Sequence, residues 1–218
     1  LTGGFGSGGT YEPQFSYPSR LVSMLNSYIA PAANGLAVAP IGSSVDARWT
    51  LGTGWAFLAA YGFGNASCYY ATAPAGALVF ADPRITADRF DVYYATLTGN
   101  GTITATATGG GGVTISCNAA ANVNKITCNA AALGTGNTVS ITATGAIVEI
   151  IAVEPWDSTT SKIRIGNVGR NGTGSNQWID DTLGISSLTS VRAYAPALTI
   201  IGLGTNDSVA TSLATFQT

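Results

Sequence analysis

The 218-residue sequence contains no histidine, and this absence excludes more chemistry than any other feature of its composition. Serine hydrolases use a histidine as the general base that activates the nucleophile, and an unassisted serine is a poor nucleophile at neutral pH. These residues alone therefore cannot complete a Ser–His–Asp triad. Ser7, in the glycine-rich stretch "FGSGG", lacks the first glycine of a nucleophile elbow and is interpreted as part of a loop.

Charge is scarce as well: charged residues make up 9% of the chain, the net charge is −2, and no long basic stretch occurs. Nucleic-acid binding requires cations that neutralise phosphates, so we expect no DNA or RNA partner. The longest apolar runs, such as "AIVEIIAV" at 146–153, are far shorter than the roughly 18 residues that span a bilayer. We therefore expect no membrane insertion.

Cysteine is the third scarce residue, with three in the chain. Cys117 and Cys128 flank "NAAANVNKIT", which is typical of the end of a β-hairpin. Symmetric pairing about Asn122 and Val123 would place the two sulfurs opposite each other, at disulfide distance. A disulfide and two buried thiols are both open alternatives. Cys68 is unpaired in either case and, with no histidine to activate it, is not predicted to be a nucleophile.

The sequence is rich instead in Gly, Ala, Ser, Thr and Asn, a bias common in extracellular and virion-associated β-proteins, and we expect one of these locations. Between 76 and 157, short runs of alternating apolar and polar residues are separated by glycine or asparagine turns. Strands with turn signals about every ten residues indicate an antiparallel sandwich or jelly roll. The runs are "GALVFAD", "RFDVYYATL", "GTITATAT", "GVTISCNA", "NKITCNA", "NTVSITAT" and "AIVEIIAVEPW".

The flanks of this stretch have a different pattern. Residues 17–30 place apolar side chains at helical spacing, whereas 35–75 is rich in Gly and Ala with scattered aromatics and little periodicity. After 162 we predict a short strand in "KIRIGNVG", helices in "SNQWIDDTLG" and "SLTSVRAYA", and a buried parallel strand in "ALTIIGLG". This predicts an α/β domain made of residues 1–70 and 158–218, interrupted by an inserted β-sandwich at 76–157.

Two polar loops follow the predicted strands of the α/β part, "NVGRNGTGS" and "GTNDS". In an open α/β sheet, ligands bind where loops leave the carboxyl ends of the strands. The backbone N–H of Gly172 and the side-chain amide of Asn206 could together form an oxyanion hole for acyl transfer. Arg170 and Thr205 are the candidate substrate contacts, although an arginine at that position could instead pair with a surface carboxylate.

These segments resemble the SGNH (GDSL-type) hydrolases, esterases and lipases that share four sequence blocks. "LTGGFG" at 1–6 is similar to the continuation of the first block, "NVGRNG" matches the second through Asn167 and Gly172, and "GTND" at 204–207 matches the third. The resemblance implies a serine esterase or deacetylase, inactive as this chain stands, that needs no cofactor and acts on an acylated glycan or small ester. Its fold would be a parallel sheet flanked by helices.

The family's nucleophilic serine would fall immediately before Leu1, and its D-x-x-H block is absent. The chain is then either a fragment of an esterase or a natural relative that has lost catalysis. The β-module is similar to jelly rolls inserted in phage-tail esterases and in some bacterial carbohydrate esterases.

A different class of function also remains open. The chain could be a non-catalytic glycan-binding or structural component of a phage tail fibre or adhesin, with a trimer as the expected homo-oligomer. Aromatic side chains could then stack on sugar rings, although we expect most of them to lie in the core. The candidates are Trp49, Trp55, Tyr93 and Tyr94.

Overall fold

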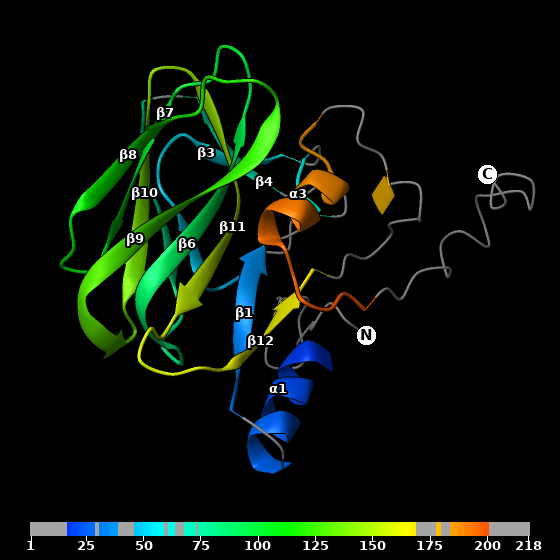
Figure 1. The fold of residues 1–218 in the computed structure, drawn as a ribbon. Coiled ribbons are helices and arrows are strands. Elements are labelled where there is room, and N and C mark those ends of the chain that lie inside the picture. The colour runs from blue at the N-terminus through cyan, green and yellow to red at the C-terminus, as the bar shows by residue number, and fades with distance from the viewer. Residues whose placement is uncertain are drawn as a thin grey trace, which may run out of the picture.

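The computed structural model describes residues 17–28, 31–38, 46–58, 61–63, 68–72, 74–168, 178–179 and 184–200. Two β-sheets dominate these residues, and Figure 1 shows them with α1 (Tyr17–Tyr28) below β1 and β12 and α3 (Ser187–Tyr194) beside the strands. No helix among the described residues has the length and apolar character that a membrane crossing requires.

The smaller sheet contains five strands, all of them joined by antiparallel pairing. Their apolar residues alternate with threonine and serine, which places one set of side chains in the core and the other on the surface. In β10, for example, Val139, Ile141 and Ala143 are buried. The strand order is β2 (Trp49–Leu51), β5 (Ala75–Ala81), β10 (Thr138–Thr144), β7 (Thr102–Ala107) and β8 (Gly112–Ser116).

The larger sheet has seven strands and branches at β11 (Ile147–Trp156). One edge of β11 pairs along almost its full length with β6 (Thr86–Thr96), which in turn pairs with β9 (Asn122–Thr135). The other edge is shared, because β4 (Cys68–Thr72) pairs with the first half of β11 and β1 (Ala32–Val38) with the second. β3 (Trp55–Leu58) extends the β4 branch, and β12 (Ile163–Asn167) extends the β1 branch.

The main core lies between the two sheets and includes Phe80, Phe90 and Ile103. Trp49 contacts both Tyr69 and Phe80 there, with ring centroids 5.1 Å apart in each pair. Trp49, Trp55 and Tyr94 are buried in this core. Their side chains therefore serve in packing and are not available to stack on a sugar ring.

A second apolar cluster covers part of the opposite, outer face of the seven-stranded sheet. Leu36, Tyr93 and Ile151 contribute to it from the strands, and Ile185 and Tyr194 from the segment that forms α3. Ser186 caps this helix by accepting a hydrogen bond from the backbone N–H of Thr189. α3 therefore covers one half of the outer face and leaves the other half to the polar residues described below.

The predicted α/β SGNH-like parallel sheet flanked by helices is wrong. The sheets are antiparallel or mixed, and the only parallel pair among the described strands is β1 with β12; the described helical residues are α1, α3 and residues 178–179, which lie in the predicted helix "SNQWIDDTLG". The stretch 35–75, which shows little periodicity, contains β2, β3 and β4: β2 pairs with β5, β4 with β11, and β3 with β4.

The buried strand predicted in "ALTIIGLG" is also wrong for the residues that the structure describes. Residues 198–200 lie outside any strand, and Leu198 and Ile200 are exposed. By contrast, the seven runs predicted as strands between 76 and 157 correspond to β5 through β11, and "KIRIGNVG" contains β12. The helices predicted over 17–30 and in "SLTSVRAYA" correspond to α1 and α3.

The predicted hairpin that would bring Cys117 and Cys128 together is wrong as well. Cys117 follows β8 in the five-stranded sheet, whereas Cys128 lies opposite Phe90 in the seven-stranded sheet. Both are free, buried thiols, as is Cys68. Burial, their main perturbation, raises the pKa of Cys117 to about 12 and that of Cys128 to about 11. Neither cysteine is therefore a reactive thiolate at neutral pH.

Candidate functional site

Strand register gathers charged residues on the open half of the outer face. In β6, Phe90 and Val92 point into the main core, so Arg89 and Asp91 point outward. The antiparallel register places Arg89 opposite Trp156 and Asp91 opposite Glu154. Residues that are more than sixty positions apart in the chain thus form a single surface.

Asp91 is fully buried beneath this surface and is held by three side chains. Arg89 donates to its two oxygens from Nε at 3.1 Å and Nη2 at 2.8 Å, Lys125 Nζ lies 3.1 Å away, and Thr127 Oγ1 donates at 2.7 Å. Burial works against the charged form, but these hydrogen bonds outweigh it and hold the pKa of Asp91 below its ordinary value. Asp91 is therefore an ionised anchor for two cations.

Glu154 is a second buried carboxylate, held from the other side. Arg164 of β12 donates from Nε to its Oε1 at 2.9 Å, and the hydroxyls of Tyr93 and Tyr194 lie 3.4 and 3.3 Å from its oxygens. Arg164 lies on β12 and reaches Glu154 across the neighbouring strand β1. β1 has a glycine near this carboxylate: a Cβ at Gly35 would lie 3.2 Å from Glu154 Oε1. Burial, followed by the nearby Glu154 charge, raises the pKa of both tyrosines, which stay neutral donors.

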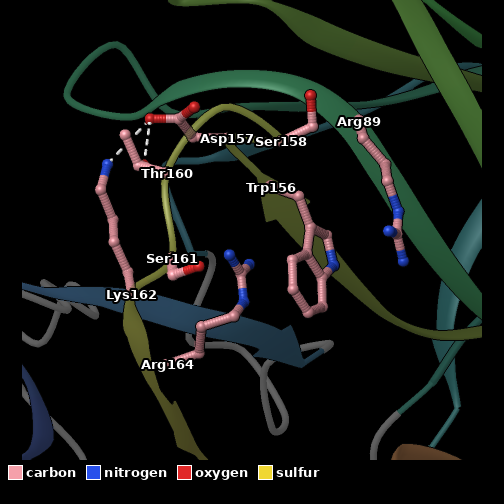
Figure 2. A pocket seen from close by; sticks show the side chains of 8 residues that line it. All are labelled: Arg89, Trp156, Asp157, Ser158, Thr160, Ser161, Lys162 and Arg164. Carbon is pink, nitrogen blue, oxygen red and sulfur yellow. Dashed lines mark hydrogen bonds and ion pairs between the residues drawn. The ribbon is translucent and has the colours of Figure 1, made fainter.

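Trp156 stands between two arginines at the end of β11. The guanidinium carbon of Arg164 lies 3.7 Å from its ring centroid and that of Arg89 lies 4.6 Å away. Figure 2 shows the two guanidinium groups on opposite sides of the ring. Each contact is a cation–π interaction, which also fixes the plane of the guanidinium group.

A surface pocket of about 350 Å³ opens at this point (Figure 2). Its lining consists of Arg89, Trp156, Lys162 and Arg164 together with residues of the turn between β11 and β12. Asp157 organises that turn by accepting hydrogen bonds from the hydroxyls of Thr159 at 2.6 Å and Thr160 at 2.7 Å and from Lys162 Nζ at 3.0 Å. These hydrogen bonds lower the pKa of Asp157, and the bond from Thr159 has the largest effect.

The covered half of the outer face contains a carboxylate with much weaker support. Glu149 is buried and, among the described residues, accepts one hydrogen bond, from Asn100 Nδ2 at 2.6 Å. Burial raises its pKa, and the bond from Asn100 opposes this only in part. No group of three or more His, Cys, Asp or Glu side chains in the described part of the chain could hold a metal ion.

The four residues predicted to form an oxyanion hole and its substrate contacts, Gly172, Asn206, Arg170 and Thr205, lie outside the described residues. The pocket residues were not singled out by sequence reasoning. The available indication was the concentration of cations in "PWDSTTSKIR", where Lys162 and Arg164 lie six and eight residues after Trp156 in a chain with only nine Lys and Arg.

No protein-family model and no curated protein matches the chain. Similar solved structures include a peptidoglycan O-acetylesterase, with a TM-score of 0.50, 15% identity and coverage of 74% of this chain and 45% of that one. They also include a family two carbohydrate esterase from Cellvibrio japonicus, with a TM-score of 0.39, 12% identity and coverage of 55% and 32%. A third is the exo-β-1,3-galactanase of Phanerochaete chrysosporium, with a TM-score of 0.38, 12% identity and coverage of 57% and 30%.

The chain spans less than half of the length of each of these three structures. At this level of identity, the first match shows a shared fold. This likeness of fold gives no specific support to the SGNH family that the sequence motifs suggested.

Proposed function

We propose that the β-sandwich is a glycan-binding module of a carbohydrate-active protein. The observation that carries this proposal is the pocket beside Trp156, where hydrogen-bond donors, hydroxyl groups and an aromatic edge converge on one surface. Its volume of about 350 Å³ falls within the usual range for small-molecule sites. The shared fold with a peptidoglycan O-acetylesterase supports the choice of a glycan as ligand.

The aromatic ring and both arginines of the pocket lie on strands, and its cations are held by ion pairs, which favours a preformed site. Arg89 and Arg164 are each fixed by a buried carboxylate and by Trp156, so little side-chain freedom remains to be lost when a ligand binds. Ser161, on the rim, is exposed and adds a hydroxyl group that can donate to or accept from a sugar hydroxyl.

The test is affinity electrophoresis of the purified chain in gels that contain one soluble polysaccharide each, neutral and acidic. We expect retardation by at least one polysaccharide and its loss in Trp156→Ala, because the arginines lose the ring that orients them. Tyr28→Ala, which removes an exposed aromatic from α1, is the matched control and should bind like the parent. Unchanged mobility in every gel would contradict a glycan-binding role.

A second candidate, acyl-ester hydrolysis, is favoured by the same fold likeness and by the two glycine-containing loops. In this proposal Gly172 and Asn206 donate to the oxyanion, Arg170 and Thr205 contact an acylated glycan, and a serine outside these residues is the nucleophile. A histidine base would also have to come from outside the 218 residues, which contain none. Hydrolysis of p-nitrophenyl acetate by a protein that carries this chain, reduced about 10²–10³-fold in Asn206→Ala, would support it.

A further inference from the structure

The pocket exposes its cations and hides its carboxylates. The side chain of Arg89 is 35% exposed, whereas its partner Asp91 is 0% exposed; Lys162 is 28% exposed and Asp157 only 9%. Arg164 is 12% exposed, and its partner Glu154 is 2% exposed. A ligand that approaches this surface therefore meets positive charge first, although the chain as a whole has a net charge of −2.

The two arginines retain unused donors on this surface. Arg89 uses Nε and Nη2 to bind Asp91, and Arg164 uses Nε to bind Glu154 and Nη2 to bind the carbonyl oxygen of Pro155. The Nη1 group of each has no hydrogen-bond partner in the part of the chain that the structure describes. Nη1 of an arginine carries two N–H donors, so the pocket offers a set of charged donors in fixed planes.

Trp156 cannot serve as an open stacking platform, because a guanidinium group lies against each side of its ring. Recognition of a neutral sugar by stacking on an exposed aromatic face is therefore not favoured here. The ring instead orients Arg89 and Arg164, and binding energy must come from their hydrogen bonds and charge.

We propose that this pocket binds the carboxylates of an acidic polysaccharide, with the Nη1 group of Arg89 as donor on one side of Trp156 and the Nη1 group of Arg164 and the Lys162 ammonium as donors on the other. This inference rests on the proposed glycan-binding function and adds the chemical class of the ligand. A planar carboxylate matches the fork of a guanidinium group, and Ser161 at the rim can bind a neighbouring sugar hydroxyl. A sulfate ester has the same charge but a tetrahedral shape, so the experiment includes it as a separate arm.

The test compares two forms of one polymer by isothermal titration calorimetry: polygalacturonate with free carboxylates and the same polymer fully methyl-esterified. We expect binding to the first, weakened by salt, and at least about tenfold weaker binding to the second, because esterification removes the charge that strengthens each hydrogen bond. Chondroitin sulfate that has been carboxyl-reduced supplies sulfate without carboxylate and should also bind at least about tenfold more weakly.

Variants locate the site. Arg89→Gln and Lys162→Gln should each weaken polygalacturonate binding about tenfold, and Arg89→Lys should recover only part of the loss because lysine lacks the fork. Arg84→Gln, which removes an exposed arginine paired with Asp82 outside the pocket, is the matched control and should bind normally. Thermal unfolding of every variant shows whether it is folded.

The outcomes separate the two proposals. Suppose that the acid and the methyl ester bind equally well and that Trp156→Ala abolishes the binding of both. This result would overturn carboxylate recognition and leave the proposed glycan binding intact. Equal binding of the reduced, sulfated polymer would overturn the preference for carboxylate over other anions. Normal binding by Arg89→Gln and Lys162→Gln would overturn the placement in this pocket, and failure of every polysaccharide to bind would contradict both proposals.

Discussion

The outer face of the seven-stranded sheet buries carboxylates in two different ways. In the open half, Asp91 is surrounded by Arg89, Lys125 and Thr127, and its pKa is lowered despite burial. In the covered half, Glu149 has Asn100 as its hydrogen-bond donor, and its pKa is raised. Burial opposes ionisation at both positions, so the number and charge of the donors decide the sign of the shift.

The open half of the outer face is organised for charge, and the covered half is organised for apolar packing. In the open half, Arg89 and Lys125 hold Asp91 in place, and Arg164 holds Glu154. The side chains of Arg89 and Lys125 are also partly exposed to solvent. The covered half packs apolar side chains under α3 and leaves one carboxylate poorly supported. Three substitutions test this contrast through the free energy of unfolding.

Arg164→Ala should have the largest effect, a loss of about 3–5 kcal/mol in the free energy of unfolding, because it leaves Glu154 buried without its cation. Urea unfolding followed by tryptophan fluorescence measures this change. Lys162→Ala is the matched control in the same region: it removes a partly exposed partner of Asp157 and should cost less than about 1 kcal/mol. Equal losses in the two variants would show that Glu154 does not depend on Arg164.

Asp91→Asn should cost about 1–3 kcal/mol at pH 7, since the neutral amide cannot accept charge-assisted bonds from both Arg89 and Lys125. Because the folded pKa of Asp91 is lowered, its stabilisation is present above the ordinary pKa of 3.8 and is lost as the pH falls through the folded value. The parent should therefore lose stability in acid more steeply than the variant. Parallel pH profiles of thermal unfolding would refute this role for Asp91.

Glu149→Gln should have the smallest effect and the opposite sign, a gain on the order of 1 kcal/mol at pH 7. The raised pKa means that ionised Glu149 destabilises the fold, and this cost appears as the pH rises from the ordinary value of 4.5 through the folded value. The gain should disappear below about pH 4, where the carboxyl is protonated in both the folded and unfolded states. A loss of stability at pH 7 would mean that Asn100 supports the carboxylate better than the single hydrogen bond suggests.

The sequence predicted the regions where local pattern decides the structure. Alternating residues such as Ile103 and Ala105, separated by threonine, indicated strands because every second side chain enters the core. The short strand around Trp49 had no such pattern: three residues are too few to show a period, and pairing with β5 determines its structure. Local pattern also misassigned the fold class, since glycine-containing loops after apolar runs occur in both α/β and all-β proteins.

The pocket was harder to predict than the strands. Arg89, Trp156 and Arg164 become neighbours only through the register of β6 with β11 and through the arrangement of β12 beside β1. A single sequence does not state which strands pair, so it could not show that these side chains share one surface. The oxyanion residues proposed from the sequence, Gly172 and Asn206, remain predictions.

The parallel pair formed by β1 and β12 has a consequence for modularity. Ala32, where the chain enters the seven-stranded sheet, lies beside Ile163, where β12, a strand of the same sheet, begins. Adjacent strands are about 4.8 Å apart, so the entry and exit of the segment between them almost coincide. The chain from Ala32 to Lys162 therefore departs from and returns to one place, which is the end geometry with which insertion of one protein segment into another is tolerated.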